Sequence, residues 1–224
     1  MDVGARSNGR LAAWLGFVAF FASVAYAGNL ADEEELGEPL YEPEFFIASM
    51  VGFAILAGAA VLIAIGTDMR SMFAFRRPRS WPKALGISLL VFVGVLLVSA
   101  ALGAFVDPAE EQGLLPETWP PPDSLVFGLN AASVVIGAAL AEELLFRGIG
   151  YTLLERFGTT FAVVGSAAAW AAAHGLFGGF PLIFAFGVGL GLLRRASTSI
   201  FPGIVLHGLF NAFALVAAAV SSSS

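Results

Sequence analysis

Residues 124–147 read SLVFGLNAASVVIGAALAEELLFR, a largely apolar run that ends in two carboxylates and a guanidinium. The apolar part is long enough to cross a bilayer as one helix, which takes about 20 residues. Glu142, Glu143 and Arg147 are unusual there, because a charged side chain at the centre of a membrane-spanning helix costs roughly 2.5–3.5 kcal/mol on insertion scales. Three such groups together need partners, water or a chemical role.

The rest of the chain has the composition of an integral membrane protein. Hydrophobic residues make up 58 % of the 224 residues, charged residues only 12 %, and the mean hydropathy is +0.85. Lipid offers the backbone no hydrogen-bond partners and the apolar runs lack the alternation of barrel strands, so helices are expected. The predicted fold class is all-α, a polytopic helical membrane protein. The apolar runs give seven candidate transmembrane helices, at 11–27, 45–65, 84–106, 124–146, 161–177, 181–193 and 200–220.

The first of these runs also fits a second interpretation. Residues 11–27 follow Arg6 and Arg10 and end near the small residues Ala25 and Ala27, as a secretory signal sequence does. The run is long enough to span, however, and the charge distribution is more consistent with a retained helix.

Charge is strongly segregated between the candidate spans. Residues 32–44 and 107–123 contain twelve acidic residues and no basic one, whereas residues 67–83 contain four arginines and a lysine. With seven spans and a cytoplasmic N-terminus, all eleven Lys and Arg residues fall on one side. The positive-inside rule then predicts a multi-pass protein of the cell membrane with its C-terminus outside. The net charge of −6 comes mainly from the acidic loops, so membrane lipid is an expected partner and nucleic acid is not.

Several polar residues lie inside the apolar runs. The only two histidines, His174 and His207, both lie in candidate spans, and Asn211 follows His207 by four residues, on the same helical face. Glu143 and Arg147 have the spacing of a helical ion pair. Glu142 is rotated by about 100° from Glu143 and is left free. The alternatives are structural histidines bonded to neighbouring helices and a charged group that snorkels to the membrane surface.

The side chains of Glu142, His174, His207 and Asn211 suit hydrolysis. A carboxylate in an apolar site can act as general base towards water, imidazoles can share the proton transfers, and an amide can donate to an oxyanion. Glu142, His174 and His207 are also candidate ligands of a divalent metal such as zinc. The chain has no cysteine, which excludes thiolate zinc sites and a cysteine nucleophile. Water activation by the glutamate alone and by a metal both remain open.

The three motifs resemble those of the CAAX-processing and bacteriocin-processing (CPBP or Abi) family of intramembrane proteases. Residues 142–147 match Glu-Glu-x-x-x-Arg, and residues 207–211 match His-x-x-x-Asn. The family's Phe-x-x-x-His becomes Trp-x-x-x-His here, with Trp170 and His174. The likeness covers roughly residues 124–212.

The resemblance implies an intramembrane endopeptidase with its catalytic core in the four C-terminal helices. Residues 124–220 would hold the site, 1–123 would form an N-terminal three-helix membrane region, and 221–224 would be a disordered tail. The catalytic residues implied by the match are Glu142 as base, His174 to hold water or a metal, and His207 with Asn211 at the oxyanion. Glu143, Arg147 and Trp170 would support them.

The substrate, the metal requirement and the oligomeric state remain open at this point. Family members act on prenylated CAAX proteins or on leader-type and bacteriocin-type peptides. A non-catalytic immunity or scaffold protein of the same fold is the alternative function, and a proton transporter is disfavoured because the other spans lack ionisable groups.

The candidate span at 124–146 raises a geometric difficulty. Glu142 would lie near the cytoplasmic end of its helix, whereas His174 would lie about 20 Å along the next one. We therefore expect residues 148–157 to form a further helical stretch that brings Glu142 deeper into the membrane.

Overall fold

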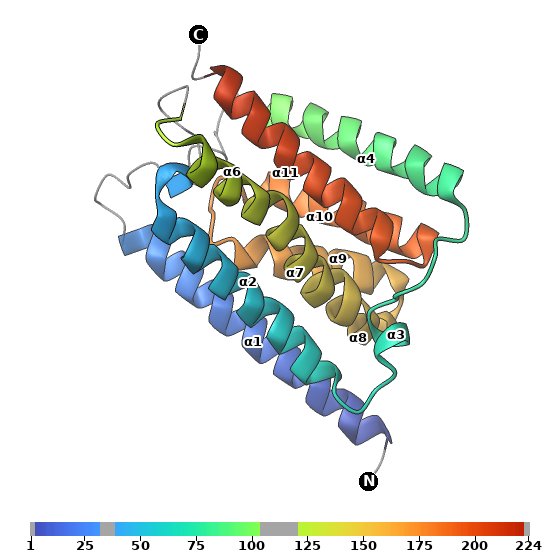
Figure 1. Cartoon of the computed structure of the whole chain (residues 1–224). Helices are drawn as coiled ribbons and strands as arrows, with labels where there is room; N and C mark the ends of the chain where they lie inside the picture. Colours follow the sequence, from blue (N-terminus) through green and yellow to red (C-terminus); the bar gives the residue numbers. More distant parts are fainter. Residues whose placement is uncertain (1–2, 32–38, 104–120, 222–224) are drawn as a thin grey trace.

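The computed structural model describes residues 3–31, 39–103 and 121–221. Every regular element in these ranges is helical and none is a strand (Figure 1). The predicted all-α class is confirmed. Most of the acidic segments 32–44 and 107–123, and all but the first residue of the predicted tail 221–224, lie outside the described residues.

Helices of membrane-spanning length dominate the described ranges, where six are long and apolar enough to cross a bilayer. A seventh apolar helix, α9 (Thr159–Ala173), has only 15 residues and is shorter than a usual span. The chain is therefore a multi-pass membrane protein, while helix length does not support the predicted count of seven. The six are α1 (Val3–Ala31), α2 (Pro43–Ala64), α4 (Trp81–Leu102), the helix Ser124–Phe157, α10 (Phe180–Ser197) and α11 (Phe201–Ser221).

The helix Ser124–Phe157 is one continuous element of 34 residues, which we call the site helix. The helix continues past the predicted end at 146, and the predicted helical stretch over 148–157 is present. Two of its segments are π-helical, with the wider i→i+5 hydrogen bonding that is frequent at functional sites. In order, the site helix consists of α6 (Ser124–Ala132), η2 (Ser133–Ala138), α7 (Ala139–Glu142), η3 (Glu143–Gly150), α8 (Tyr151–Leu154) and η4 (Glu155–Phe157).

The greater length of the site helix also changes where Arg147 lies relative to the end of the helix. The candidate span 124–146 ended just before Arg147, but Arg147 lies inside the site helix and is fully buried. The sequence suggested an earlier end because a charged residue after an apolar run usually marks the end of a span. Here the charge is compensated by Glu143 in the same helix and by contacts from α9 and α10.

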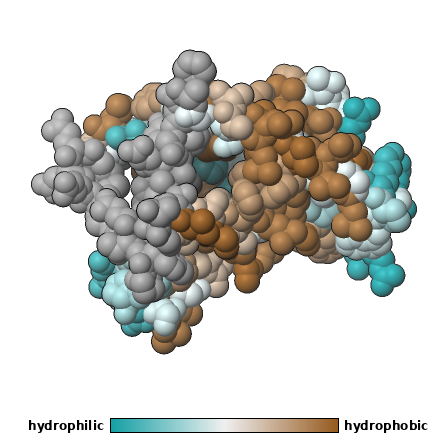
Figure 2. Space-filling model, turned by 90° about the horizontal axis from the view of Figure 1, so that it is seen from above, coloured by the Kyte–Doolittle hydropathy of each residue, from teal (hydrophilic) through white to brown (hydrophobic). Residues whose placement is uncertain are grey.

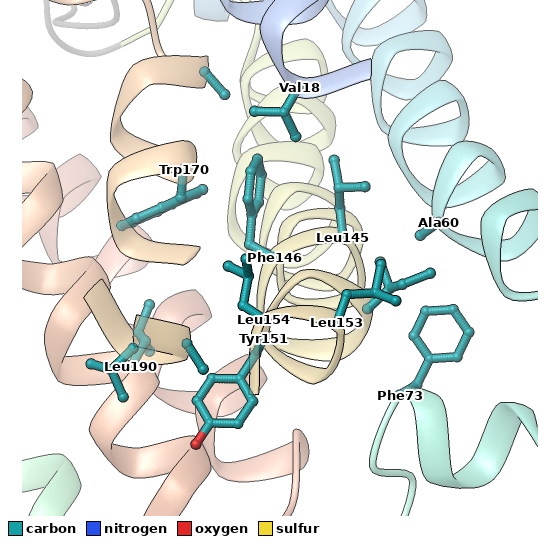
Figure 3. Packing of buried hydrophobic residues seen from close by; sticks show 14 of the residues in the cluster. Val18, Ala60, Phe73, Leu145, Phe146, Tyr151, Leu153, Leu154, Trp170 and Leu190 are labelled. Carbon is teal, nitrogen blue, oxygen red and sulfur yellow. The ribbon is translucent and has the colours of Figure 1, made fainter. Parts of the chain in front are cut away.

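Side chains from several helices converge on the second half of the site helix (Figure 3). From α1, the buried Trp14 donates its indole N–H to the carbonyl of Leu145 at 3.0 Å. A Cβ at Gly150 would lie 2.5 Å from the same indole ring, so this close approach requires glycine. Helix α1 is thus an integral part of the bundle and braces the segment that carries the charged residues.

Helices α9 and α10 pack closely through small residues. A Cβ at Gly187 would meet Ala167 at 3.0 Å, and one at Gly191 would meet Val163 at 3.1 Å. Small residues let helix backbones approach each other in a membrane, where burial of apolar surface does not drive association. This packing places α9, which carries Trp170, against α10 and beside the site helix.

The segment between α2 and α4 crosses one end of the bundle. It contains the short helix α3 (Met69–Met72), whose N-cap is Asp68; the Ser71 hydroxyl donates to this carboxyl and lowers its pKa. The backbone N–H of Arg79 donates to the carbonyl of Ser197 at 3.1 Å, which fastens the start of α4 to the end of α10. Figure 2 shows hydrophilic residues gathered at the right-hand end of the bundle and apolar residues over the middle of the visible face.

Candidate active site

Glu143 and Arg147 form a buried ion pair in η3. Arg147 Nη1 lies 3.3 Å from Glu143 Oε1, and both side chains are almost completely inaccessible. Arg147 Nη2 donates to the carbonyl of Gly187 at 3.2 Å, and its guanidinium stacks 4.4 Å above the ring of Trp170. The predicted ion pair is therefore present, and α9 and α10 complete its surroundings.

Glu142 has a different environment from its neighbour. Its Oε2 accepts a hydrogen bond from the Trp170 indole N–H and lies 3.8 Å from His207 Nε2. Its side chain retains 14 % exposure, against 1 % for Glu143. Glu142 is thus the accessible carboxylate of the two, and it is held by a neutral donor rather than by a guanidinium.

His207 lies between the two carboxylates. Its Nε2 faces Glu142, and its Nδ1 lies 3.4 Å from Glu143 Oε1. The imidazole itself is buried. Helix α11 approaches closely enough for this because Gly203 has no side chain: a Cβ there would lie 2.6 Å from Glu143 Oε2.

Trp170 contacts most of the polar residues of the site. Its ring meets His174 edge-on with the centroids 5.0 Å apart, and His207 with the centroids 5.2 Å apart. Its indole N–H is the donor to Glu142. Sequence reasoning gave Trp170 a supporting position on the strength of aromatic bulk alone. The missed signal is that tryptophan, unlike phenylalanine, has a hydrogen-bond donor.

His174 and Asn211 lie at the edges of this group. His174 follows α9, and its Nδ1 lies 2.9 Å from the carbonyl of Trp170. No ion pair joins it to a carboxylate in the described part of the chain. Asn211 donates its side-chain amide to the carbonyl of Val134 in η2 at 3.0 Å. The structure therefore brings Glu142, Glu143, Arg147, Trp170 and His207 together, with His174 tied to Trp170 and Asn211 tied to the site helix.

This geometry coincides with a match to a known protein family. Residues 124–213 match the family described as Type II CAAX prenyl endopeptidase Rce1-like. The match covers less than half of the chain, and we call these residues the matched segment. The match confirms the resemblance that the motifs indicate, and it spans the site helix, α9, α10 and the first part of α11. No curated protein and no solved structure gives a significant match.

The matched segment contains all three candidate metal ligands, Glu142, His174 and His207. Among the described residues, no three or more His, Cys, Asp or Glu side chains are grouped so that they could hold a metal ion. Of the three candidate ligands, Glu142 and His207 face each other, and the Nδ1 of His174 lies against the Trp170 carbonyl, which leaves its Nε2 as the nitrogen that could bind a metal. The ligand set Glu142, His174 and His207 stays a prediction, and the reaction proposed below is built on the side chains alone.

Proposed function

We propose that this protein is an intramembrane endopeptidase that hydrolyses a peptide bond of a membrane-associated substrate. The observation that carries the proposal is the accessible carboxylate of Glu142, held by Trp170 and faced by His207 within a membrane-spanning helix. A carboxylate in such an apolar position costs free energy, and ionisable residues inside membrane helices therefore usually mark functional sites. The Rce1-like match of residues 124–213 supports a protease at the level of the family.

In the proposed reaction, Glu142 is the general base. It takes a proton from a water molecule whose oxygen attacks the carbonyl carbon of the substrate, and a tetrahedral oxyanion forms. Glu142 then returns the proton to the amide nitrogen and the C–N bond breaks, which releases a carboxylic acid and an amine that ionise to a carboxylate and an ammonium group. His207 and Asn211 are proposed to donate hydrogen bonds to the oxyanion, and His174 to hold the water.

The buried ion pair has a supporting role in this scheme. Arg147 compensates the charge of Glu143, so the second carboxylate does not have to share the proton or the partners of Glu142. We propose that the helices of residues 124–220 hold all reacting groups and that residues 1–123 brace them. The hydrogen bond from Trp14 to the carbonyl of Leu145 supports this division, because it ties α1 directly to η3.

The description of the matched family suggests the substrate class. It names a CAAX prenyl endopeptidase, and we propose a prenylated CAAX-type protein as the substrate, with a leader-type peptide as the second candidate. The test incubates the purified protein with a quenched fluorescent peptide that ends in a prenylated CAAX sequence. We expect one cleavage, mapped by mass spectrometry, that Glu142→Ala abolishes. An uncleaved prenylated peptide together with a cleaved leader peptide would exclude the first class.

We also propose that seven helices cross the membrane, with the N-terminus in the cytoplasm and α9 as the short seventh span. The start of α1 and the end of α11 lie at opposite ends of the bundle (Figure 1), which supports an odd number of crossings. The chain has no native cysteine, so single cysteines introduced at Arg77 and Glu44 can be labelled with an impermeant maleimide. In intact cells, only the cysteine at position 44 should react.

Removal of metal should leave the proposed reaction intact. The predicted rate after treatment with a chelator, followed by desalting, stays within about twofold of the untreated rate, because Glu142 and not a metal activates the water. Metal analysis of the same sample checks that it is metal-free. A loss of activity that zinc restores would contradict the proposed role of Glu142 as sole activator.

A further inference from the structure

A groove between α4 and α10 lies apart from the candidate active site, at the end of the bundle where the loop before α4 meets the end of α10. The hydrogen bond from Arg79 N–H to the Ser197 carbonyl joins these two segments. The cavity measures about 510 Å³, within the usual range for a small-molecule pocket. Its lining residues are Arg79, Lys83, Ile87, Leu192, Arg195 and Ala196.

Both walls of this groove change from cationic to apolar in the same direction. Helix α4 begins at this end, so Ile87 lies one turn deeper than Lys83 on the same face. Helix α10 ends here, so Leu192 lies about one turn deeper than Arg195. The groove therefore presents positive charge at its mouth and hydrocarbon further in.

The groove closes one turn below its apolar part. A Cβ at Gly189 would lie 2.4 Å from the side chain of Val91, so the two helices touch at that level. From Lys83 to Val91 the depth is about 12 Å at 1.5 Å per residue. Leu85 and Leu89, which neighbour the groove on α4, are 66 % and 64 % exposed, as expected of a helix that faces lipid.

The cations at the mouth lack acidic partners. Arg79, Lys83 and Arg195 are exposed, and none of them forms an ion pair with a carboxylate of the described residues. Within the described ranges, no acidic residue lines the cavity. Three positive charges without such a counter-charge favour an anionic ligand.

We propose that this groove binds one anionic phospholipid, with the headgroup phosphate between Arg79, Lys83 and Arg195 and the start of an acyl chain along Ile87 and Leu192. Basic pockets between transmembrane helices bind anionic headgroups in this way. A soluble phosphate would use only the mouth of the groove, whereas a phospholipid matches both its charge and its apolar depth. The inference goes beyond the proposed peptidase activity and does not depend on it.

The test measures lipid binding to the full chain purified in a neutral detergent. Native mass spectrometry counts bound phosphatidylglycerol, with phosphatidylcholine and inorganic phosphate as comparison probes. The variant Lys83→Gln/Arg195→Gln removes two cations from the groove, and Arg70→Gln/Arg77→Gln removes two exposed cations of the same end outside it. All four side chains are exposed, so both variants should fold, and an unchanged thermal midpoint without lipid checks this.

We expect one phosphatidylglycerol to bind more tightly than phosphatidylcholine. The groove variant should weaken this binding by about 25-fold, on the order of fivefold per cation, and the control variant by less than twofold. Equal weakening in the two variants would overturn the proposal, because it would indicate general surface charge. Equal binding of phosphatidylcholine, or binding of inorganic phosphate at the same concentration, would also overturn it.

Discussion

The two carboxylates of the site, adjacent in sequence, have opposite environments. Glu143 is sealed in the bundle and paired with Arg147, whereas Glu142 keeps access and faces Trp170 and His207. A rotation of about 100° along the helix separates them. Two carboxylates within one turn of a membrane helix can therefore have different roles, one compensated by an ion pair for stability and its neighbour left free to react.

The largest effect on stability should follow from breaking the sealed side. Arg147→Met leaves Glu143 buried without its cation, and removing one partner of a buried pair costs roughly 3–5 kcal/mol of unfolding free energy. The measurement is thermal or denaturant unfolding in detergent. Arg77→Met removes an exposed arginine from a loop and should change stability by less than about 0.5 kcal/mol. Equal unfolding midpoints for the two variants would contradict the compensating role of Arg147.

A smaller effect is expected where α11 approaches Glu143. Gly203→Ala would place a Cβ 2.6 Å from Glu143 Oε2, so the helix or the carboxylate must move, and overpacking of this kind costs about 1–3 kcal/mol. Gly94→Ala in α4 is the matched control, because nothing lies within 4 Å of the position that its Cβ would take. That change should stabilise the protein by about 0.5–1 kcal/mol through helix propensity. If both substitutions shift the unfolding midpoint in the same direction, the close approach at Gly203 does not contribute to stability as predicted.

The third effect is on catalysis and concerns the accessible side of the site. Trp170→Phe keeps the aromatic bulk but removes the donor to Glu142, and hydrogen bonds to charged groups contribute about 1.5–3 kcal/mol. We expect kcat to fall about tenfold or more with KM unchanged, since the base is no longer held in position.

Trp14→Phe provides the control for this prediction. It also removes a buried indole hydrogen bond, but that bond goes to the Leu145 carbonyl and not to Glu142. It should lower stability and leave kcat nearly unchanged. A Trp170→Phe enzyme that loses stability but keeps its kcat would show that the indole only fills space.

Much of the architecture follows from local sequence. The apolar runs predict the long helices, and the spacing of Glu143 and Arg147 predicts their ion pair, because both depend on contacts within one helix. The extent of the site helix does not follow in the same way. Charges at 142–147 normally end a span, and their burial depends on partners from other helices, such as the carbonyl of Gly187 and the ring of Trp170.

The details of the site depend still more on tertiary structure. The two π-helical segments have no signal that we recognised in the sequence, yet one of them contains the carbonyl of Val134 to which Asn211 donates. The motif spacing put Asn211 on the same face as His207 but could not identify this partner. Likewise, the motif predicts a supporting role for the aromatic ring of Trp170. Its hydrogen bond to Glu142 depends on how α9 packs against the site helix, which the sequence does not reveal.

The most direct test compares isosteric changes of the two carboxylates in the same assay. Glu142→Gln should lower the cleavage rate by about 10²–10⁴-fold, as expected for loss of a general base, with an unfolding midpoint close to that of the parent protein. Glu143→Gln should mainly lower the midpoint, because it leaves Arg147 buried without its counter-charge. Full cleavage activity in Glu142→Gln, or loss of activity without loss of stability in Glu143→Gln alone, would contradict the division of roles between these neighbours.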